Sequence, residues 1–174
     1  MGVSYGLSKL YYAVISDNGY STPKHLPGAV KIDLTPITRD IKFTGLDGEE
    51  KKPYTILDGY DGTIESAGLT DDFLVNILGY SRDTDGSLVE DGSVIALPNC
   101  AIMFETLGEK TRHRYYYCEF LRPSFSAETL SESVKVDTVT LSVRIRKHPT
   151  TKKIKRILKD TSADSYKTWF TAVV

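Results

Sequence analysis

Residues 60–80 read YDGTIESAGLTDDFLVNILGY, and they predict a strand that runs directly into a short amphipathic helix. Thr70 is placed to cap this helix, because its hydroxyl can accept a hydrogen bond from a backbone N–H of the first turn. Apolar residues then follow with helical spacing, and Gly79 is a typical left-handed stop. A helix of about two and a half turns is too short to be stable alone. We therefore expect it, over about residues 69–79, to pack against neighbouring strands.

Most of the remaining chain is patterned as β-strands. Val30, Ile32 and Leu34 alternate with polar residues, which is typical of a half-buried strand. Residues 45–53 (GLDGEEKKP) combine glycine, proline and charge, so we expect a loop there between paired strands. With roughly eight to ten strand segments, the sequence predicts one mainly β domain over residues 1–174. The expected architecture is a β-sandwich or partial barrel with one short flanking helix, and the tail beyond residue 162 could form a second.

A hairpin is expected between residues 94–107 and 111–121, joined by Gly108-Glu109-Lys110. The first of these strands is apolar on both faces, so it should lie centrally in a sheet or be covered by another subunit. If Leu107 faces Thr111, the residue numbers of paired positions sum to 218 throughout. One face then carries Cys100, Ile102, Phe104, Tyr116, Cys118 and Phe120, and the other carries Ala101, Met103, Tyr115 and Tyr117. A change of one residue in the loop would reverse these faces.

The region after residue 133 changes its hydrophobic phase. Apolar residues fall on even numbers at 134 and 136 and on odd numbers from Val139 to Ile145, which predicts a β-bulge or sharp bend near Thr138. Residues 148–151 then form a turn, and 153–159 return as a basic strand. The tail carries large aromatic side chains that we expect to be docked on this domain or on a neighbour, namely Tyr166, Trp169 and Phe170.

Charge is balanced overall but divided along the chain. Lys and Arg number 22 and Asp and Glu 23, giving a net charge of −1 and no general bias toward nucleic acid or membrane. Residues 58–93 hold nine acids and one base, whereas residues 144–159 hold eight bases and no acid. These two regions are either separately solvated faces or complementary surfaces between copies of the protein.

The sequence also lacks the signals of export. No apolar run approaches the roughly 20 residues needed to cross a bilayer, and the first ten residues contain no signal-peptide core. Two cysteines in 174 residues fit a reduced compartment better than a disulfide scaffold. We therefore expect an unprocessed protein made in the cytosol.

Motifs for catalysis or metal binding are not found in the sequence. His25, His113 and His148 lie in three different segments, and neither cysteine has zinc-ligand spacing. Phosphate-binding loops and nucleophile elbows are also missing. The three tyrosines at 115–117 cannot form one base-stacking platform, because successive strand residues point to opposite faces. We expect no enzyme activity, no cofactor and no metal.

Several segments recur in an order and spacing typical of one protein family. They are YGLSKLYYAVI (5–15), LPGAVKIDL (26–34), residues 60–80, DGSLVEDG (85–92), RHRYYYCEFLRPSFSAETLSESVKVDTVTLSVRIR (112–146) and WFTAV (169–173). Together they resemble the major tail tube proteins of long, non-contractile-tailed bacteriophages, in the group found in phages and prophages of Gram-positive bacteria. The resemblance covers nearly the whole chain and is weakest at residues 37–54 and 146–159.

The resemblance implies a structural virion protein. Such subunits form stacked rings, expected to be hexameric, that build the hollow tail tube through which DNA passes during ejection. The implied partners are other copies of the chain and further tail proteins, namely the tape measure, distal tail and tail terminator proteins. DNA would be cargo, so we expect a neutral to acidic lumen, with residues 144–159 on the outside or at an interface. The protein would then reside in the virion tail after synthesis in the bacterial host.

Three segments are expected to mediate assembly: an N-terminal arm (1–10), the loop at 45–53 and a C-terminal arm (160–174). The interface candidates are Tyr5, Leu7, Leu10, Asp47, Glu49, Lys51, Met103, Tyr115, Tyr117, Lys153, Arg156, Trp169 and Phe170. Two alternatives stay open. One is a monomeric carbohydrate- or partner-binding β-sandwich module of a phage tail or bacterial surface, and the other is a small β-fold enzyme with a clustered polar site. A prophage-derived bacteriocin tube would have the same sequence pattern.

Overall fold

The computed structural model describes residues 5–44, 48, 50–93, 96–125 and 138–174, with side chains of residues 5, 43–44 and 50–53 left aside. The strands are β1 (Tyr5–Ser16), β2 (Gly19–Tyr20), β3 (Lys24–His25), β4 (Ala29–Thr44), β5 (Glu50–Ser66), β6 (Tyr80–Arg82), β7 (Leu88–Glu90), β8 (Cys100–Leu107), β9 (Arg112–Phe120), β10 (Val139–Arg146) and β11 (Lys155–Leu158). The helices are α1 (Asp71–Asn76) and α2 (Asp164–Lys167).

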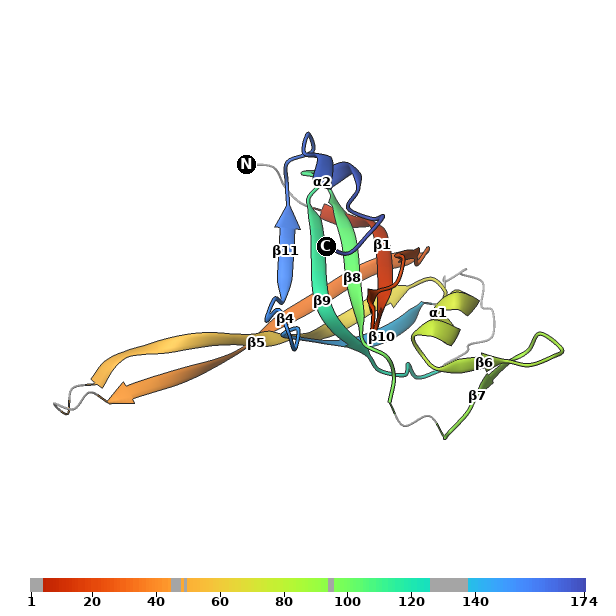
Figure 1. Cartoon of the computed structure of the whole chain (residues 1–174), viewed down its shortest axis with the longest axis horizontal. Coiled ribbons are helices and arrows are strands. Elements are labelled where there is room, and N and C mark those ends of the chain that lie inside the picture. Colours follow the sequence, from red (N-terminus) through yellow and green to blue (C-terminus); the bar gives the residue numbers. More distant parts are fainter. Residues whose placement is uncertain (1–4, 45–47, 49, 94–95, 126–137) are drawn as a thin grey trace, which may run out of the picture.

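One antiparallel sheet organises the molecule (Figure 1). Its strands follow the order β2-β1-β8-β9-β10-β5-β4, with β3 added beside β1 and β11 beside β9, while β6 and β7 form a separate hairpin. The sheet is not closed into a barrel. The expected mainly β fold with short helices is confirmed.

The main core lies on one face of the bent sheet, between the β1–β8–β9 half and the β10–β5–β4 half. Its buried members are Leu10, Tyr12, Leu26, Ile64, Phe73, Ile77, Leu78, Cys100, Ile102, Phe104, Tyr115, Cys118, Phe120, Leu141, Val143 and Ile145. In β10 the residues alternate as expected, because Leu141, Val143 and Ile145 are buried while Ser142 and Arg144 are exposed. The bulge expected near Thr138 falls largely on residues 126–137, which lie outside the described residues.

Helix α1 begins as the sequence predicts. The Thr70 hydroxyl accepts a hydrogen bond from the Phe73 backbone N–H at 3.2 Å, and Gly79 has a φ of 75°. The α-helix itself ends at Asn76, so it is shorter than the expected 69–79, although Ile77 and Leu78 still donate to carbonyls of the last turn. Phe73 is fully buried against the sheet, which supplies the packing that so short a helix requires.

The β8–β9 hairpin corrects the expected register. Cys100 does face Cys118, but Ile102 faces Tyr115 and Phe104 faces His113, one position away from the prediction. A bulge between these pairs absorbs the difference, so Tyr116 and Tyr117 both lie outside the main core and Tyr115 takes the predicted core place of Tyr116. The loop is also one residue longer than expected, because β9 begins at Arg112.

Two further expectations are corrected at the chain's connections. The predicted loop at 45–53 is shorter, since Glu50 already pairs with Thr44 and residues 50–53 belong to β5. The basic strand spans Lys155–Leu158 and pairs with β9, not with the preceding β10. The first difference arises because backbone pairing with β4 continues through the polar residues at the start of β5, where side-chain propensity alone favours a loop.

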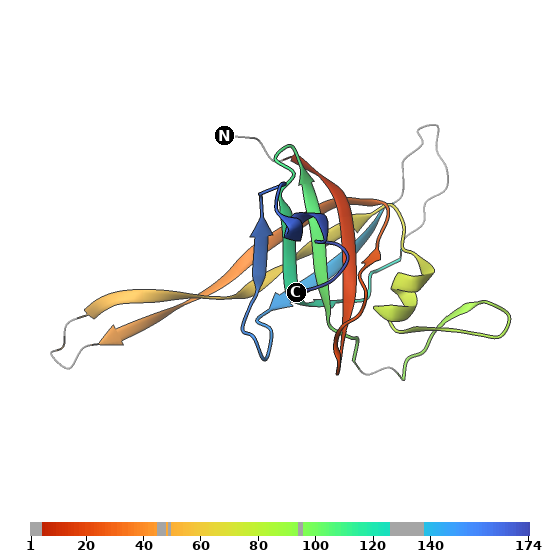
Figure 2. The same cartoon turned by 45° about the horizontal axis from the view of Figure 1, so that its top comes forward.

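The tail after residue 162 does contain a short helix, α2, and its aromatics dock on their own domain. Tyr166 and Trp169 are buried against β8 and β9, and Phe170 stacks on Tyr11 of β1 with ring centroids 4.6 Å apart. Figure 2 shows residues 160–174, in dark blue, lying across the outer side of these strands.

Candidate assembly surfaces

The most prominent surface feature is the outer half of the β4–β5 hairpin, which projects far from the rest of the molecule (Figure 1). Among the described residues, β10 pairs with β5 only from Gly59 to Ser66. Beyond that point the hairpin is a two-stranded ribbon, which we call the arm, comprising residues 38–44 of β4 and 50–57 of β5. An isolated two-stranded ribbon is at best marginally stable in water. The arm therefore has the features of a segment that contact with a partner would stabilise.

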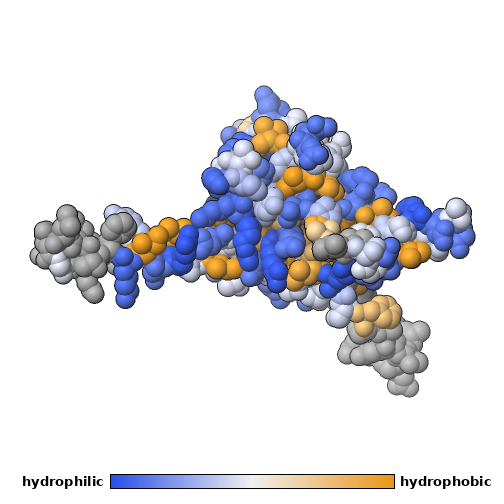
Figure 3. All heavy atoms as spheres, turned by 60° about the horizontal axis from the view of Figure 1, so that its bottom comes forward, coloured by the Kyte–Doolittle hydropathy of each residue, from blue (hydrophilic) through white to orange (hydrophobic). Residues whose placement is uncertain are grey.

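One side of the arm is mostly apolar. Ile41 faces Tyr54, and Arg39 faces Ile56, and directly opposed residues share a face of an antiparallel pair. The side chain of Tyr54 is 67% exposed, whereas the two isoleucines are half-buried. The other side is more polar, and there the Thr55 hydroxyl donates to Asp40 at 2.8 Å. Figure 3 shows hydrophobic residues open to solvent along the arm.

The base of the arm is fixed to β10 and to the residue that follows it. Arg146 binds Asp61 at 2.7 Å, and Asp58 lies between Lys147 at 3.4 Å and Arg39 at 3.0 Å. The register between β4 and β5 shifts between positions 37 and 38 of β4. Gly59, the partner of Ile37, packs closely on β10 at this point. A Cβ on Gly59 would overlap the Ile145 carbonyl, so only glycine fits there. These contacts set the direction in which the arm leaves the body.

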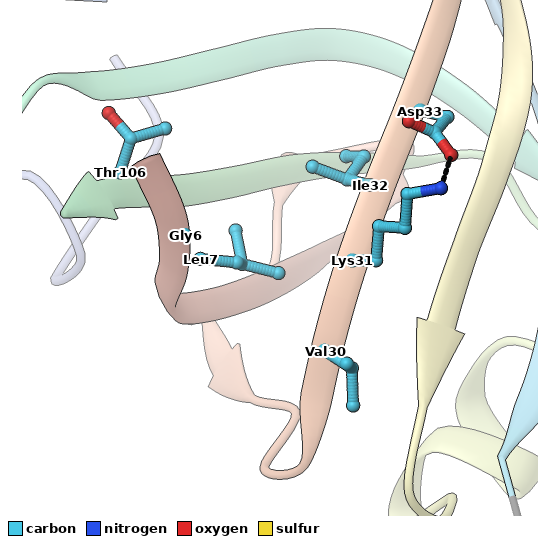
Figure 4. A pocket seen from close by; sticks show the side chains of 7 residues that line it. All are labelled: Gly6, Leu7, Val30, Lys31, Ile32, Asp33 and Thr106. Carbon is cyan, nitrogen blue, oxygen red and sulfur yellow. Dashed lines mark ion pairs between the residues drawn. The ribbon is translucent and has the colours of Figure 1, made fainter. Parts of the chain in front are cut away.

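A second feature is a shallow hollow where β1 and β4 approach each other without pairing (Figure 4). We call it the β1–β4 hollow; its volume is about 260 Å³, and it is lined by Gly6, Leu7, Val30, Lys31, Ile32, Asp33 and Thr106. Val30 is 54% exposed, and Lys31 binds Asp33 at 2.6 Å on the rim. The strand β1 is bulged on both sides of Leu7, which interrupts its regular edge here. The hollow is thus an exposed, partly apolar surface on the body.

The outer face of β8 and β9 is covered by residues 164–174, which we call the C-terminal segment. Arg114 of β9 donates to the carbonyl oxygens of Trp169 and Ala172 at 2.9 and 3.0 Å, and to that of Val174 at 2.8 Å. Its guanidinium lies 4.2 Å from the centre of the Trp169 ring. Burial lowers the pKa of Arg114, an expected consequence of removing a cation from water.

Arg112 holds the beginning of the same segment. Its guanidinium binds Glu105, donates to the Tyr166 carbonyl and stacks on the Tyr166 ring. Burial alone would raise the pKa of Glu105, but the hydrogen bond and charge of Arg112 and the Tyr166 hydroxyl outweigh it and keep this pKa below its ordinary value. The Glu105 carboxylate therefore stays ionised at neutral pH.

His113 of β9 is half-buried, and its surroundings favour the neutral imidazole. Its ring stacks on Phe104 with centroids 4.9 Å apart. Burial, together with the charges of Lys155 and Lys159, lowers the pKa of His113 to about 4. The imidazole is therefore neutral at physiological pH. Within the described residues there is no group of three or more His, Cys, Asp and Glu side chains that could hold a metal ion.

The predicted interface residues fall into four groups. Tyr5 pairs with Leu107 in the sheet, Leu7 lines the β1–β4 hollow, and the exposed Lys153 and Arg156 lie in and beside β11. Four are buried in their own subunit: Leu10, Met103, Tyr115 and Trp169. Tyr117 and Phe170 are half-buried, and the Tyr117 hydroxyl accepts a hydrogen bond from Asn99.

Three further candidates fall within the predicted loop at 45–53. Lys51 belongs to β5 opposite Phe43, whereas Asp47 and Glu49 lie outside the described residues. A role of any of these residues in subunit contacts stays a prediction, as does the position of residues 144–159 relative to a lumen. For the four buried ones the subunit itself already supplies the neighbours.

Sequence reasoning missed two sets of residues. It did not assign Arg112 and Arg114 as anchors of the C-terminal segment, although two arginines on one face of an aromatic strand indicate a second covered face. The β1–β4 hollow is also not predicted by the sequence, because the alternation of Val30 and Ile32 with polar residues indicates only a half-buried strand.

Comparisons with known proteins add little to this geometry. No protein-family model and no curated protein matches the sequence. One solved structure with a similar chain is described as "Cryo-EM structure of the anti-feeding prophage (AFP) baseplate, 6-fold symmetrised". The TM-score is 0.42 at 14% identity, over 90% of this chain and 94% of that chain. A similarity at this TM-score does not define a shared function. In the described part of the chain, neither helix has the length and apolar character needed to span a membrane.

Proposed function

We propose that this protein is a structural subunit of a phage tail. Copies assemble into stacked, hexameric rings that form the hollow tube through which DNA passes. The subunit is not an enzyme and acts through contacts with its own copies and with other tail proteins. It is made in the host cytoplasm and resides in the virion tail. This proposal joins the family resemblance of the sequence to the shape of the folded chain.

The observation that carries the proposal is the arm. The described side chains of the arm contribute little to the subunit's own core. Its two strands are nevertheless long, are paired on both sides of a register shift after Ile41, and are fixed at the base by Asp58 and Asp61. A ribbon with an apolar side exposed to water costs stability in a monomer and gains it when another surface covers that side. Such a segment is expected in a protein that functions as an assembly.

The free edge of the sheet supports the same function. In the described part of the chain β4 is the last strand of the order, so its outer edge is not hydrogen-bonded to another strand there. An edge of 16 residues is a template for pairing with a further chain unless it is covered. Pairing of such edges around a ring would remove them from solvent.

Light scattering and negative-stain microscopy over a concentration series test the proposal. The matched variant lacks residues 39–56 and joins Thr38 to Leu57 through an Asn-Gly turn, because these two residues are already cross-strand partners. We expect rings or tubes for the natural chain and monomers of unchanged thermal midpoint for the shortened one. A natural chain that stays monomeric at every concentration would contradict the proposal. A glycan-binding screen would then test the carbohydrate-binding alternative.

A further inference from the structure

Carboxylates that have no cationic partner in their own subunit gather on one projecting hairpin. Most acids of residues 58–93 bind a lysine or arginine of the same subunit, namely Asp58, Asp61, Asp71, Asp72 and Glu90. Glu65 faces Lys31 across β5 and β4. The acids of this region that form no ion pair with the described residues are exposed and lie in or beside the β6–β7 hairpin: Asp83, Asp85 and Asp91. We call residues 80–91 the acidic hairpin.

The basic residues between positions 144 and 159 divide in the same way. Some bind a carboxylate or face one in a neighbouring strand, namely Arg144, Arg146, Lys147 and Lys159. Lys155 is half-buried over the rings of Tyr60 and Tyr115. The exposed cations of this region that form no ion pair within the described part of the chain are Lys152, Lys153 and Arg156. We call these three residues, on β11 and the turn before it, the basic surface.

The contacts that items of the basic surface do make are with neutral groups. The Lys153 ammonium lies 5.8 Å from the centre of the Tyr116 ring. The Arg156 guanidinium donates to the Val174 carbonyl at 3.5 Å and lies 5.7 Å from the centre of the Trp169 ring. These contacts orient the two side chains but bring no carboxylate to them. Their positive charge is therefore available to a further anionic group.

Both charged surfaces are built on ordered turns. In the turn before β11, His148 Nδ1 accepts hydrogen bonds from the backbone N–H groups of Thr150 and Thr151, both at 3.2 Å. In the acidic hairpin, the Asp85 carboxylate accepts from the hydroxyl and the backbone N–H of Ser87 at 2.6 and 2.9 Å. These bonds lower the pKa of Asp85, so its carboxylate is charged at neutral pH. Groups that are already oriented lose less conformational freedom when they bind.

The two surfaces cannot meet within one subunit. Figures 1 and 2 both show the β6–β7 hairpin and β11 on opposite sides of the body, with the central sheet between them. The hairpin is a separate two-stranded sheet, whereas β11 pairs with β9 of the main sheet. A second copy of the chain is the partner that fits, because every copy carries both surfaces and the net charge of the chain is only −1.

We propose that the acidic hairpin of one copy binds the basic surface of another. Asp83, Asp85 and Asp91 then form ion pairs with the three cations of that surface. The inference rests on the proposed function, since it names a contact by which copies associate in the assembly. The contact is heterologous, because the two surfaces are different parts of the same chain. Repetition of such a contact produces closed rings or open stacks, depending on the rotation between copies.

Carbodiimide cross-linking of the natural chain tests the contact, because this reagent joins a carboxylate directly to an adjacent amine. Equal amounts of unlabelled and nitrogen-15-labelled protein are assembled, cross-linked and analysed by mass spectrometry. We expect Lys152 or Lys153 to be joined to the acidic hairpin in peptide pairs of mixed label, which identify links between copies. The link between Lys147 and Asp58, 3.4 Å apart in one subunit, is the positive control. Assembled protein that gives the control link and no link to the acidic hairpin would overturn the inference.

A charge exchange between the surfaces is the second test. Lys152→Glu/Lys153→Glu and Asp83→Lys/Asp85→Lys should each raise the concentration needed for assembly at least about tenfold, because like charges then meet. An equimolar mixture of these variants should assemble near the natural concentration, since each reversed surface meets an opposite charge on the other variant. A mixture that assembles no better than either variant alone would contradict the contact.

A further variant separates the charge of the acidic hairpin from the structure of its turn. Asp83→Asn/Asp85→Asn keeps the side-chain oxygens that accept hydrogen bonds from Thr84 and Ser87 and removes both charges. It should keep the natural thermal midpoint, need a higher protein concentration to assemble and lose sensitivity to salt. Assembly like that of the natural chain, with the same salt sensitivity, would also overturn the inference.

The outcomes separate this inference from the proposed function. Rings or tubes without links between the acidic hairpin and the basic surface would overturn the contact and leave the tail-tube function standing. Such links in small oligomers, with no rings or tubes at any concentration, would support the contact and contradict the tube. Monomers without links between copies would overturn both.

Discussion

The Nε atom of Arg112 donates a hydrogen bond to Oε2 of Glu105 at 2.6 Å, and this ion pair lies across the β8–β9 hairpin beneath the C-terminal segment. Only 11% of each side chain is exposed. The Tyr166 hydroxyl also donates to Glu105, so the carboxylate has partners from both the hairpin and the segment. A buried charge is tolerated only when it is paired and hydrogen-bonded. The pair therefore couples docking of the segment to the integrity of the hairpin.

Arg112→Met should destabilise the protein by about 3–5 kcal/mol, because it leaves the Glu105 carboxylate buried without its cation. Urea unfolding measures this, and the emission of Trp169, the sole tryptophan, reports release of the segment. The double variant Arg112→Met/Glu105→Gln should recover part of the loss, since no unpaired charge is left. A loss below about 1 kcal/mol in the single variant would show that the charge is not buried in solution.

Stability should fall as the pH is lowered from about 6.5 to about 4, in part because of His113. In that range the unfolded chain binds a proton on this imidazole, whereas the folded protein, with a pKa of about 4, does not. The His113→Phe variant keeps an aromatic ring beside Phe104 and removes the titration. Between about pH 6.5 and about pH 4, the free energy of unfolding of the natural chain should fall by about 2 kcal/mol more than that of His113→Phe, after allowance for the partial exposure of His113.

Urea unfolding at several pH values measures the difference between the two proteins. The control is His25→Phe, because His25 is an exposed histidine that also stacks on a neighbouring aromatic ring, that of Tyr11. This control should follow the natural chain. Parallel curves for the natural chain and His113→Phe would contradict the assignment to His113.

Gly59→Ala should be strongly destabilising, because the added Cβ would overlap the Ile145 carbonyl at the base of the arm. Relief of the overlap requires β5 to separate from β10, and we expect a cost of about 2–4 kcal/mol in thermal or urea unfolding. The matched control, Gly68→Ala, adds its Cβ in open space and should change stability by less than about 1 kcal/mol. Similar values for the two variants would show that β5 and β10 are less closely packed in solution.

Charge reversal of Lys152 and Lys153 tests whether the basic region between residues 144 and 159 contacts another copy. Both side chains are exposed, so folding should be unaffected. If the region meets an acidic surface, the double variant Lys152→Glu/Lys153→Glu should assemble less well and lose sensitivity to salt. Lys24→Glu, at an exposed lysine of β3 outside the three expected assembly segments, serves as the control. Unchanged assembly and salt sensitivity would exclude this charge-complementary contact.

Local sequence patterns predicted the elements whose hydrogen bonds and backbone geometry depend on residues only a few positions apart. The Thr70 cap, the left-handed Gly79 and the alternation of Leu141, Val143 and Ile145 depend on short-range geometry, and the structure confirms each of them. The Cys100–Cys118 pair was also correct. The rest of that hairpin was displaced by one residue, because a bulge in β9 is decided by what the two faces must cover and leaves no mark in the local pattern.

The candidate surfaces could be predicted from the sequence less well than the strands that form them. Residues 50–53 contain charge and proline and predicted a loop, yet backbone pairing with β4 extends the ribbon through them. The hollow depends on β1 and β4 approaching without pairing, which involves residues about 25 positions apart and a sheet that does not close. The hydrophobic periodicity of each strand does not indicate that β1 and β4 approach each other.

By itself the sequence determined the mainly β class, the position of the helix and the segments that resemble a phage tail protein, because propensity, capping and alternation act between near neighbours. Only the tertiary structure decided that the C-terminal segment covers Arg112 and Arg114 and that the arm extends beyond β10. These arrangements depend on which buried charges find partners and which sheet edges find cover. Both are settled by contacts between residues far apart in the chain.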